Sequence, residues 1–240
     1  LLMQALHPGS LTGVKNHSRY EQDPLGRLAG TIRWLTVTTF GSKTAVAGEA
    51  ARVNRLHERV TGEYKNGSGE RVPYRAADQD LLLWVHIAFM DSFLRAHQFY
   101  SATPIPGGAD SYIALWSKSV IGLGLERAPM SEVELKAEMQ RFENQLEVSE
   151  RTRQVVKFIQ FPPLPPVARR IYRLLFAAAV ASLEPEYRDR LDLKTLPAWL
   201  VLPLTRFTLK AMRTAIGPES PIEDAAKARL IRIGAWSPSR

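Results

Sequence analysis

The sequence contains no cysteine, and this absence excludes several kinds of chemistry at once. Disulfides, iron–sulfur clusters, thiolate ligation of haem and cysteine nucleophiles all require that residue. Common catalytic patterns are missing too: there is no GxSxG elbow, HExxH helix, Rossmann glycine fingerprint, phosphate-binding loop or paired-carboxylate motif. Histidines, with arginines close to them in the sequence, are left as the main candidates for chemistry.

Long runs of like charge and long apolar runs are also missing, although the net charge is +8. The basic residues are scattered and no nucleic-acid-binding motif accompanies them, so no nucleic-acid partner is expected. Scattered arginines favour anionic partners, and buried ones can hold carboxylates such as cofactor propionates. The most apolar segment, Leu174 to Leu183, is too short to cross a bilayer. We expect a cytoplasmic protein with at most peripheral membrane contact.

Helical periodicity dominates what remains. The chain has 240 residues, 45% of them hydrophobic, which is enough for a substantial core. No alternating segment is convincing as a strand, and the β-branched run Leu35 to Phe40 continues the helical pattern before it. We therefore predict an all-α fold, a single helical domain of about eight helices over residues 1–240. The polar segment Gly62 to Pro73 is expected to be a flexible hairpin or lid. Because the chain begins at Leu1 rather than methionine, we expect residues upstream to be missing.

Capping residues predict where several helices begin. His7-Pro8 is expected to stop an N-terminal helix. The best N-caps are Asp23 before Pro24, Ser42 or Thr44, Asp78, and Ser131 in a capping box with Glu134.

Two of the predicted helices carry a histidine close to an apolar stripe. In the first, His57 lies at the edge of the stripe that contains Leu56. In the second, His86 lies inside the stripe and shares a face with Phe89 and Phe93. A buried imidazole needs a partner, either a hydrogen bond or a metal. An ordinary core with hydrogen-bonded histidines, a haem held between helices, and a non-haem iron on His7, His57 and His86 are all compatible with this pattern.

Arg27 and Thr31 are four residues apart and therefore share a face of the helix that Pro24 opens. Gly26 and Gly30 frame the arginine and leave the backbone approachable. A helix-packing contact explains this arrangement as well as a functional one does.

Several ordered motifs in the first hundred residues resemble a broad bacterial and fungal oxygenase family. They are LLMQALHPGSLTGVKNHSRYEQDPLGRLAGTIRWLTVTTFG, VNRLHERVTG and VPYRAADQDLLLWVHIAFMDS. The family includes the latex-clearing rubber oxygenases and the endoplasmic-reticulum oxygenase of mycophenolate biosynthesis. The resemblance covers Leu1 to Tyr100, so residues 101–240 are expected to supply supporting helices.

The resemblance implies a globin-like core that binds haem b and an enzyme that uses dioxygen on an apolar unsaturated substrate, isoprenoid-like or aromatic. It implies that His57 is the axial iron ligand and that Arg27 and Thr31 lie on the distal side. Arg27 would then stabilise reduced oxygen by a charge-assisted hydrogen bond, and Thr31 would orient oxygen or relay a proton. Cofactor or substrate contacts are also expected from His86, Trp84 and Phe89, with apolar walls completed by Trp34 and Phe93.

The sequence departs from the rubber oxygenases at three of these positions. Thr61 stands where their HxxVR-like pattern has arginine. Gly30 replaces a lysine able to bind the iron, so a self-ligated closed state is not expected here. His86 stands where they have threonine, so its role does not carry over. A different class of function, a non-catalytic helical protein that binds lipid or isoprenoid, is the alternative that the apolar segments Leu174 to Leu183 and Leu196 to Leu204 suggest.

Overall fold

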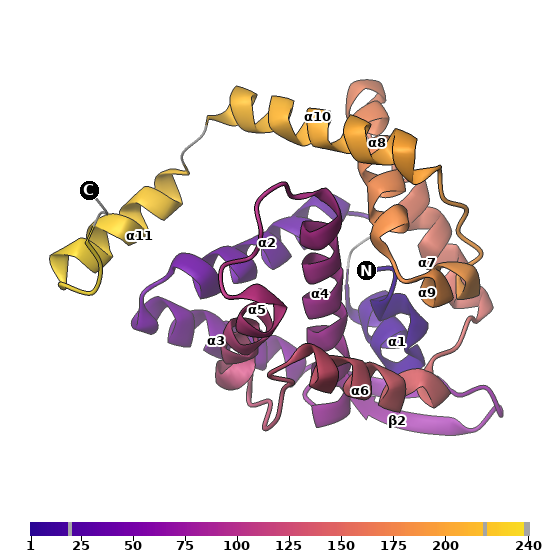
Figure 1. The fold of residues 1–240 in the computed structure, drawn as a ribbon. Coiled ribbons are helices and arrows are strands. Elements are labelled where there is room, and N and C mark those ends of the chain that lie inside the picture. Colours follow the sequence, from indigo (N-terminus) through magenta and orange to yellow (C-terminus); the bar gives the residue numbers. More distant parts are fainter. Residues whose placement is uncertain (19–20, 218–219, 238–240) are drawn as a thin grey trace.

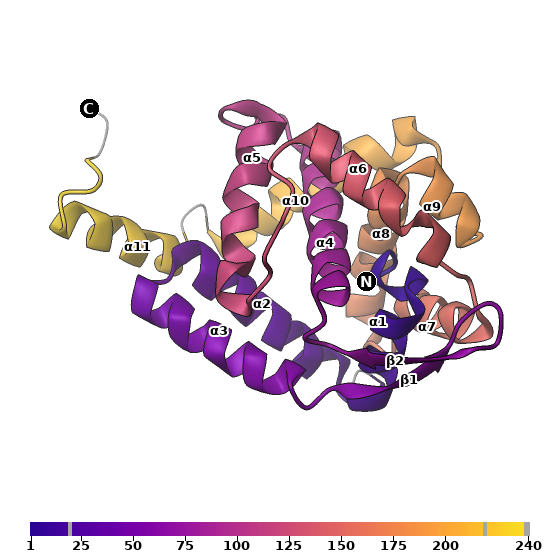
Figure 2. The same cartoon turned by 90° about the horizontal axis from the view of Figure 1, so that it is seen from below.

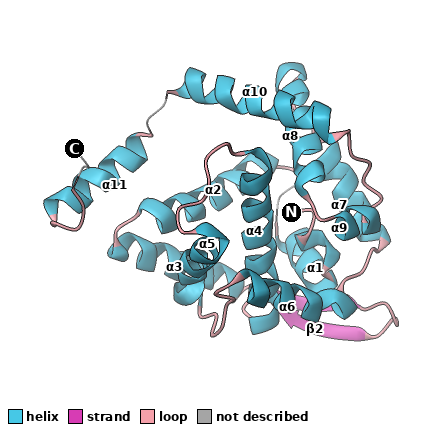
Figure 3. Ribbon diagram, in the orientation of Figure 1, coloured by secondary structure: helices cyan, strands magenta, loops and turns pink. Residues whose placement is uncertain are grey.

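A computed structural model describes residues 1–18, 21–217 and 220–237. Within them the chain is predominantly helical, and its two strands form one hairpin (Figure 3). The α-helices are α1 Pro8–His17, α2 Pro24–Phe40, α3 Lys43–His57, α4 Gln79–Tyr100, α5 Gly108–Ser117, α6 Glu132–Phe142, α7 Glu150–Gln160, α8 Pro166–Ser182, α9 Pro185–Arg190, α10 Ala198–Ile216 and α11 Pro221–Arg232. Short 3-10 helices are η1 Gln4–Leu6, η2 Lys118–Leu123 and η3 Glu143–Gln145. The predicted all-α class is confirmed, with more helices than expected.

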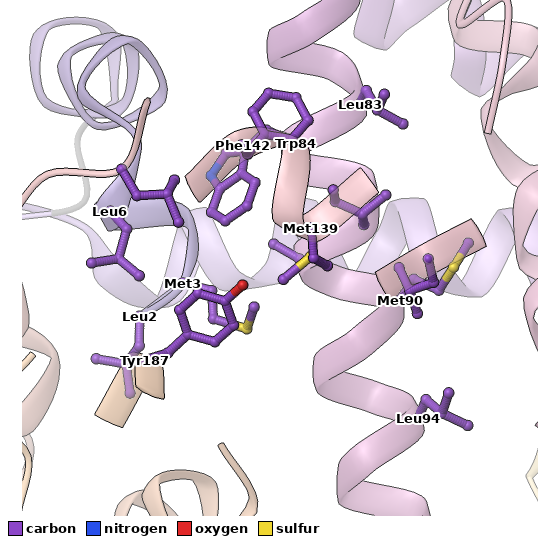
Figure 4. Packing of buried hydrophobic residues seen from close by; sticks show 14 of the residues in the cluster. Leu2, Met3, Leu6, Leu83, Trp84, Met90, Leu94, Met139, Phe142 and Tyr187 are labelled. Carbon is purple, nitrogen blue, oxygen red and sulfur yellow. The ribbon is translucent and has the colours of Figure 1, made fainter. Parts of the chain in front are cut away.

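Helix α4 is the centre of the fold, and other elements surround it (Figure 1). Ten of its residues are buried, on more than one side of the helix. Trp84 packs on Phe142 of α6, with ring centroids 5.3 Å apart, whereas Leu83, Met90 and Leu94 lie on another side of α4 within the same core cluster (Figure 4). A helix that is apolar around most of its circumference belongs in the interior of a domain. The rest of the chain is therefore organised around this helix.

The local caps explain where the helices that carry the site begin. Asp23 accepts a hydrogen bond from the amide of Gly26 at 2.9 Å, and Ser42 accepts one from the amide of Ala45 at 3.2 Å. Both satisfy amides that have no partner within the helix. The predicted cap of α2 is confirmed, Ser42 rather than Thr44 caps α3, and α2 continues to Phe40 as the sequence indicated.

Three local predictions need correction. His7-Pro8 does not only stop a helix: Pro8 is the first residue of α1, where the missing amide hydrogen of proline costs nothing. Asp78 precedes α4 but makes no cap bond, because its carboxylate accepts from the amide of Arg75 at 2.8 Å. Ser131 caps α6 as predicted, accepting from the amide of Glu134 at 3.2 Å, but the carboxylate of Glu134 accepts from the amide of Met130 and does not complete the capping box.

The statement that no segment forms a strand was also wrong. Strands β1 Thr61–Lys65 and β2 Arg71–Arg75 pair antiparallel, with Thr61 opposite Arg75. Tyr64 and Tyr74 point inward, whereas their neighbours along the strands are exposed. The hairpin extends along the lower edge of the helices, beside α1 (Figure 2).

Candidate functional site

A cavity of about 680 Å³, open to solvent, lies among α1, α2, α3, α4 and η2. Its size is ordinary for a site that binds a small molecule or a cofactor. Each helix contributes residues at helical spacing, so each turns one face toward the same space. From α2 the lining residues are Gly26, Arg27, Gly30, Thr31, Trp34 and Leu35. From α3 and α4 they include Val53, Leu56, His57, Leu81, Leu82, Val85, His86 and Phe89.

The cavity explains why helix α2 has so little buried surface. It has 17 residues, none of which is buried. Thr31 and Trp34, on the face toward the cavity, are only half-buried, and Leu28 and Ile32 on another face are 50% and 52% exposed. A helix of this length ordinarily buries one face in a core. Here that face lines a cavity instead, so a ligand would supply contacts that the protein does not.

Arg27 and Thr31 form a pre-arranged polar pair in the cavity wall. Nη1 of Arg27 donates to Oγ1 of Thr31 at 3.1 Å, and that hydroxyl donates to the carbonyl of Arg27 at 3.3 Å. Within the described part of the chain, Arg27 makes no ion pair with a carboxylate. Its remaining donors are therefore available to an anionic group in the cavity.

His57 is half-buried, and its side chain lines the same cavity. Among the residues that the structure describes, none forms a hydrogen bond with its ring nitrogens. Burial first, and then the positive charge of Arg27, lower the pKa of His57 below its usual value. At neutral pH the ring is therefore an uncharged imidazole whose lone pair is available, which is the form that binds a metal.

His86 is the second histidine of the cavity. It is 5% exposed, and burial lowers its pKa to about 4. Its Nε2 atom is buried without a hydrogen-bond partner among the described residues. The ring lies 6.3 Å from the ring of Trp116, which also lines the cavity and also leaves its indole nitrogen unpartnered. Buried polar atoms without partners are uncommon, so these two nitrogens are candidates for contact with a ligand.

Two of the other predicted residues, Trp84 and Phe93, do not line the cavity. Trp84 is fully buried in the core and does not line the cavity. Phe93 is 41% exposed and stacks on Phe89 and Trp116 from outside the lining. Of the predicted apolar walls, Trp34 and Phe89 are present.

The three-histidine iron site is contradicted by the position of His7. Its Nδ1 accepts from the amide of Ser10 at 3.4 Å, and Nε2 donates to Oε1 of Gln145 at 3.3 Å. It does not line the cavity that His57 and His86 share. No cluster of three or more histidine, aspartate or glutamate side chains suited to a metal ion occurs within residues 1–18, 21–217 and 220–237.

Trp116 and the α1 residues Ser10 and Gly13 are lining residues that sequence reasoning missed. The motif LHPGSLTGV, which contains both α1 residues, was the available signal for that side of the cavity. Trp116 lies beyond the region of resemblance, and nothing in its local pattern indicated a site.

Comparison with known proteins identifies a family. The family model described as "ER-bound oxygenase mpaB/B'/Rubber oxygenase, catalytic domain" matches residues 1–216. The match extends well past Tyr100, where the resemblance in the motifs ends. No curated protein and no solved structure matches the chain significantly.

Proposed function

Because this chain belongs to the family of mpaB and rubber oxygenase catalytic domains, we propose that it is a haem b-dependent oxygenase. Its proposed substrate is apolar and unsaturated, either isoprenoid-like or aromatic, and its co-substrate is dioxygen. The observation that carries the proposal is the meeting of a neutral, unbonded imidazole at His57 with the Arg27–Thr31 pair in one cavity.

The imidazole and guanidinium groups that line the cavity are suited to binding haem. Imidazole is a common axial ligand of haem iron, and His57 offers one without a competing hydrogen bond in the protein. Arg27 and Arg52 both line the cavity and suit the carboxylates that haem carries, although Arg52 already pairs with Glu49 at 2.6 Å. Haem iron, when bound, supplies the one-electron chemistry through which dioxygen reacts.

The proposed role of Arg27 is to hold developing negative charge on oxygen by charge-assisted hydrogen bonds. The proposed role of Thr31 is to donate a hydrogen bond to a ligand in the cavity. Its hydroxyl now donates to the carbonyl of Arg27, and rotation of the hydroxyl would free that donor. Phe89, Trp34 and the leucines of α4 would exclude water and bind the apolar substrate. His86, neutral at physiological pH, would offer a polar contact within this apolar wall.

Absorption spectroscopy after haem reconstitution tests the proposal. We expect a Soret band and stoichiometric iron in the wild-type protein, and loss of the band in His57→Ala. His97→Ala is the matched control, because that imidazole bonds the carbonyl of Thr103 at 2.9 Å outside the cavity lining and should leave the band intact. A wild-type protein that takes up no haem would reject the assignment. Lipid extracted from iron-free protein would instead favour the lipid-binding alternative, and iron without a porphyrin signal a non-haem enzyme.

A further inference from the structure

Helix α10 exposes an apolar stripe along the side that faces away from the fold. Trp199 is 77% exposed and Phe207 is 71% exposed. On the opposite side of the same helix, Val201 and Thr205 are buried and hold it to the fold. The further members of the stripe, at the i, i+3, i+4 spacing of one helical face, are Leu196 just before the helix, Leu200, Pro203 and Leu204.

Helix α8 extends this surface. It packs against α10, and the two meet α4 where Tyr100 donates to the carbonyl of Ala178 at 2.8 Å (Figure 1). At its N-terminal end, Val167 is 76% exposed and Ile171 is 44% exposed. Its apolar middle, Leu174 to Leu183, is mostly packed inward, so the lipid contact considered for that segment moves to α10 and to the start of α8.

All the charged residues of these two helices are basic. Three lie on α8 and three on α10, and neither helix contains aspartate or glutamate. The six are exposed residues: Arg169, Arg170, Arg173, Arg206, Lys210 and Arg213. Exposed aromatic and aliphatic residues bordered by lysine and arginine on an amphipathic helix are typical of a helix that lies in a membrane interface.

We propose that α8 and α10 form a docking surface for an anionic phospholipid bilayer. The six basic residues favour an anionic bilayer over a second copy of the chain. A two-fold contact with a second copy would place the same six positive charges against six others, and like charges repel. An anionic bilayer offers the opposite charge at its surface and an apolar layer just beneath it. Among the described helices none has the length and apolarity needed to cross a bilayer. The contact would therefore be peripheral, with α10 parallel to the surface.

Co-sedimentation with vesicles tests the surface in the chain of residues 1–240 without any cofactor. We expect binding to vesicles that contain phosphatidylserine, weaker binding to pure phosphatidylcholine, and loss of binding in high salt. Trp199→Ser/Phe207→Ser should reduce binding by more than about tenfold, because it removes the apolar anchors. Lys210→Glu/Arg213→Glu should also reduce it, by about fivefold or more for each charge changed.

The matched control for the apolar variant is Leu115→Ser/Val133→Ser, which changes two residues that are 64% and 79% exposed on α5 and α6. This variant should bind vesicles like the wild type. Circular dichroism melts should be unchanged in all variants, since each replaced side chain is exposed. As a direct readout, brominated lipids should quench the wild-type tryptophan fluorescence, and Trp199→Phe should remove most of that quenching.

Two results would overturn the proposal. One is equal sedimentation of the wild type and the Trp199→Ser/Phe207→Ser variant on anionic vesicles. The other is a wild-type dimer in analytical ultracentrifugation that this variant turns into a monomer, because the stripe would then be covered by a second copy.

Discussion

Nη1 of Arg27 donates to Oγ1 of Thr31 one helical turn away, at 3.1 Å, on the face of α2 that lines the cavity. The bond holds the guanidinium and the hydroxyl together before any ligand arrives. Neither side chain is buried, so the pair is not required for packing. Because the pair lies in the cavity wall beside His57, changing either residue should affect activity rather than stability.

Arg27→Leu and Thr31→Val should each lower the rate of oxygen consumption, by about 100-fold for the arginine, because a charged donor to developing negative charge is lost. Both variants should retain the Soret band, since His57 is intact. Steady-state oxygen uptake with an unsaturated hydrocarbon measures the effect. Arg33→Lys is the control on the same helix, because that side chain pairs with Glu49 instead. Undiminished oxygen uptake in Arg27→Leu would remove the arginine from the chemistry.

His86 should make the protein without cofactor less stable in acid. Its pKa is about 4 when folded and near 6.5 when unfolded, so the unfolded state binds more protons between these values. The contribution of His86 to stability is therefore present above about pH 6.5 and is lost as the pH falls toward 4. Between pH 6.5 and 4.5 this amounts to about 2 kcal/mol.

His86→Phe removes the titrating group and also the unpartnered Nε2. Urea unfolding at pH 6.5 and 4.5 should show a smaller difference in the free energy of unfolding than the wild type does. His97→Gln, which changes an exposed histidine of the same helix, should keep the wild-type difference. Equal pH dependence in the wild type and His86→Phe would show that His86 is not held neutral by burial.

The helices that carry the site were predictable because their signals are local. Asp23 with Pro24, and Ser42, each fix a helix start within four residues. A hairpin or lid was expected at Gly62 to Pro73, but its strands were missed because each is only five residues long and Pro73 interrupts one of them. The sequence predicted only a stop at His7-Pro8 because η1 ends at Leu6, and His7 is both the C-cap of η1 and the N-cap of α1.

The site was only partly predictable, and α4 shows why. Apolar residues lie around most of this helix, so its periodicity cannot tell which face meets the core and which meets a cavity. Phe89 and Trp84 looked equivalent in the sequence, yet one lines the cavity and the other packs on Phe142. Trp116 is distant in sequence from the histidines, and only tertiary packing brings it to His86. The globin-like haem core is not tested by the fold and stays a prediction, as does the division of the domain at Tyr100.

Glu49 should be important for the stability of the cavity wall. Its side chain is 2% exposed and pairs with Arg52 at 2.6 Å and with Arg33 at 3.0 Å, which ties α3 to α2. Glu49→Ala leaves the partly buried Arg52 without its partner and should lower the free energy of unfolding by about 3 kcal/mol. Glu63→Ala breaks an exposed pair with Arg71 and should cost less than about 1 kcal/mol. Chemical denaturation of both variants measures the contrast, and similar losses in the two would contradict it.

Hydrogen bonds from Arg52, the largest cause, lower the pKa of Glu49 below its ordinary value. A carboxyl group whose pKa is lowered by folding stabilises the folded state above its unfolded pKa, and that stabilisation is lost as the pH falls. The penalty of Glu49→Ala should therefore shrink in acid. Repeating the denaturation at lower pH measures this decrease. A stability loss in Glu49→Ala that stays constant or grows in acid would show that the Glu49–Arg52 ion pair is not the source of the stabilisation.

Two glycines near the cavity should respond in opposite ways to alanine. A Cβ atom at Gly122 in η2 would lie 2.9 Å from the Cβ of Ala50 in α3, so Gly122→Ala forces the two elements apart. It should cost about 1–3 kcal/mol, and it should also weaken the 3.0 Å bond from Nδ2 of Asn54 to the Gly122 carbonyl. A Cβ at Gly30 would have no neighbour within 4 Å, so Gly30→Ala should stabilise α2 by about 0.5–1 kcal/mol. Thermal melts of the two variants distinguish these signs. Because Gly30 lines the cavity, lower haem uptake in a stabilised Gly30→Ala would mean that the ligand approaches the backbone of α2, whereas unchanged uptake would place it farther from this helix.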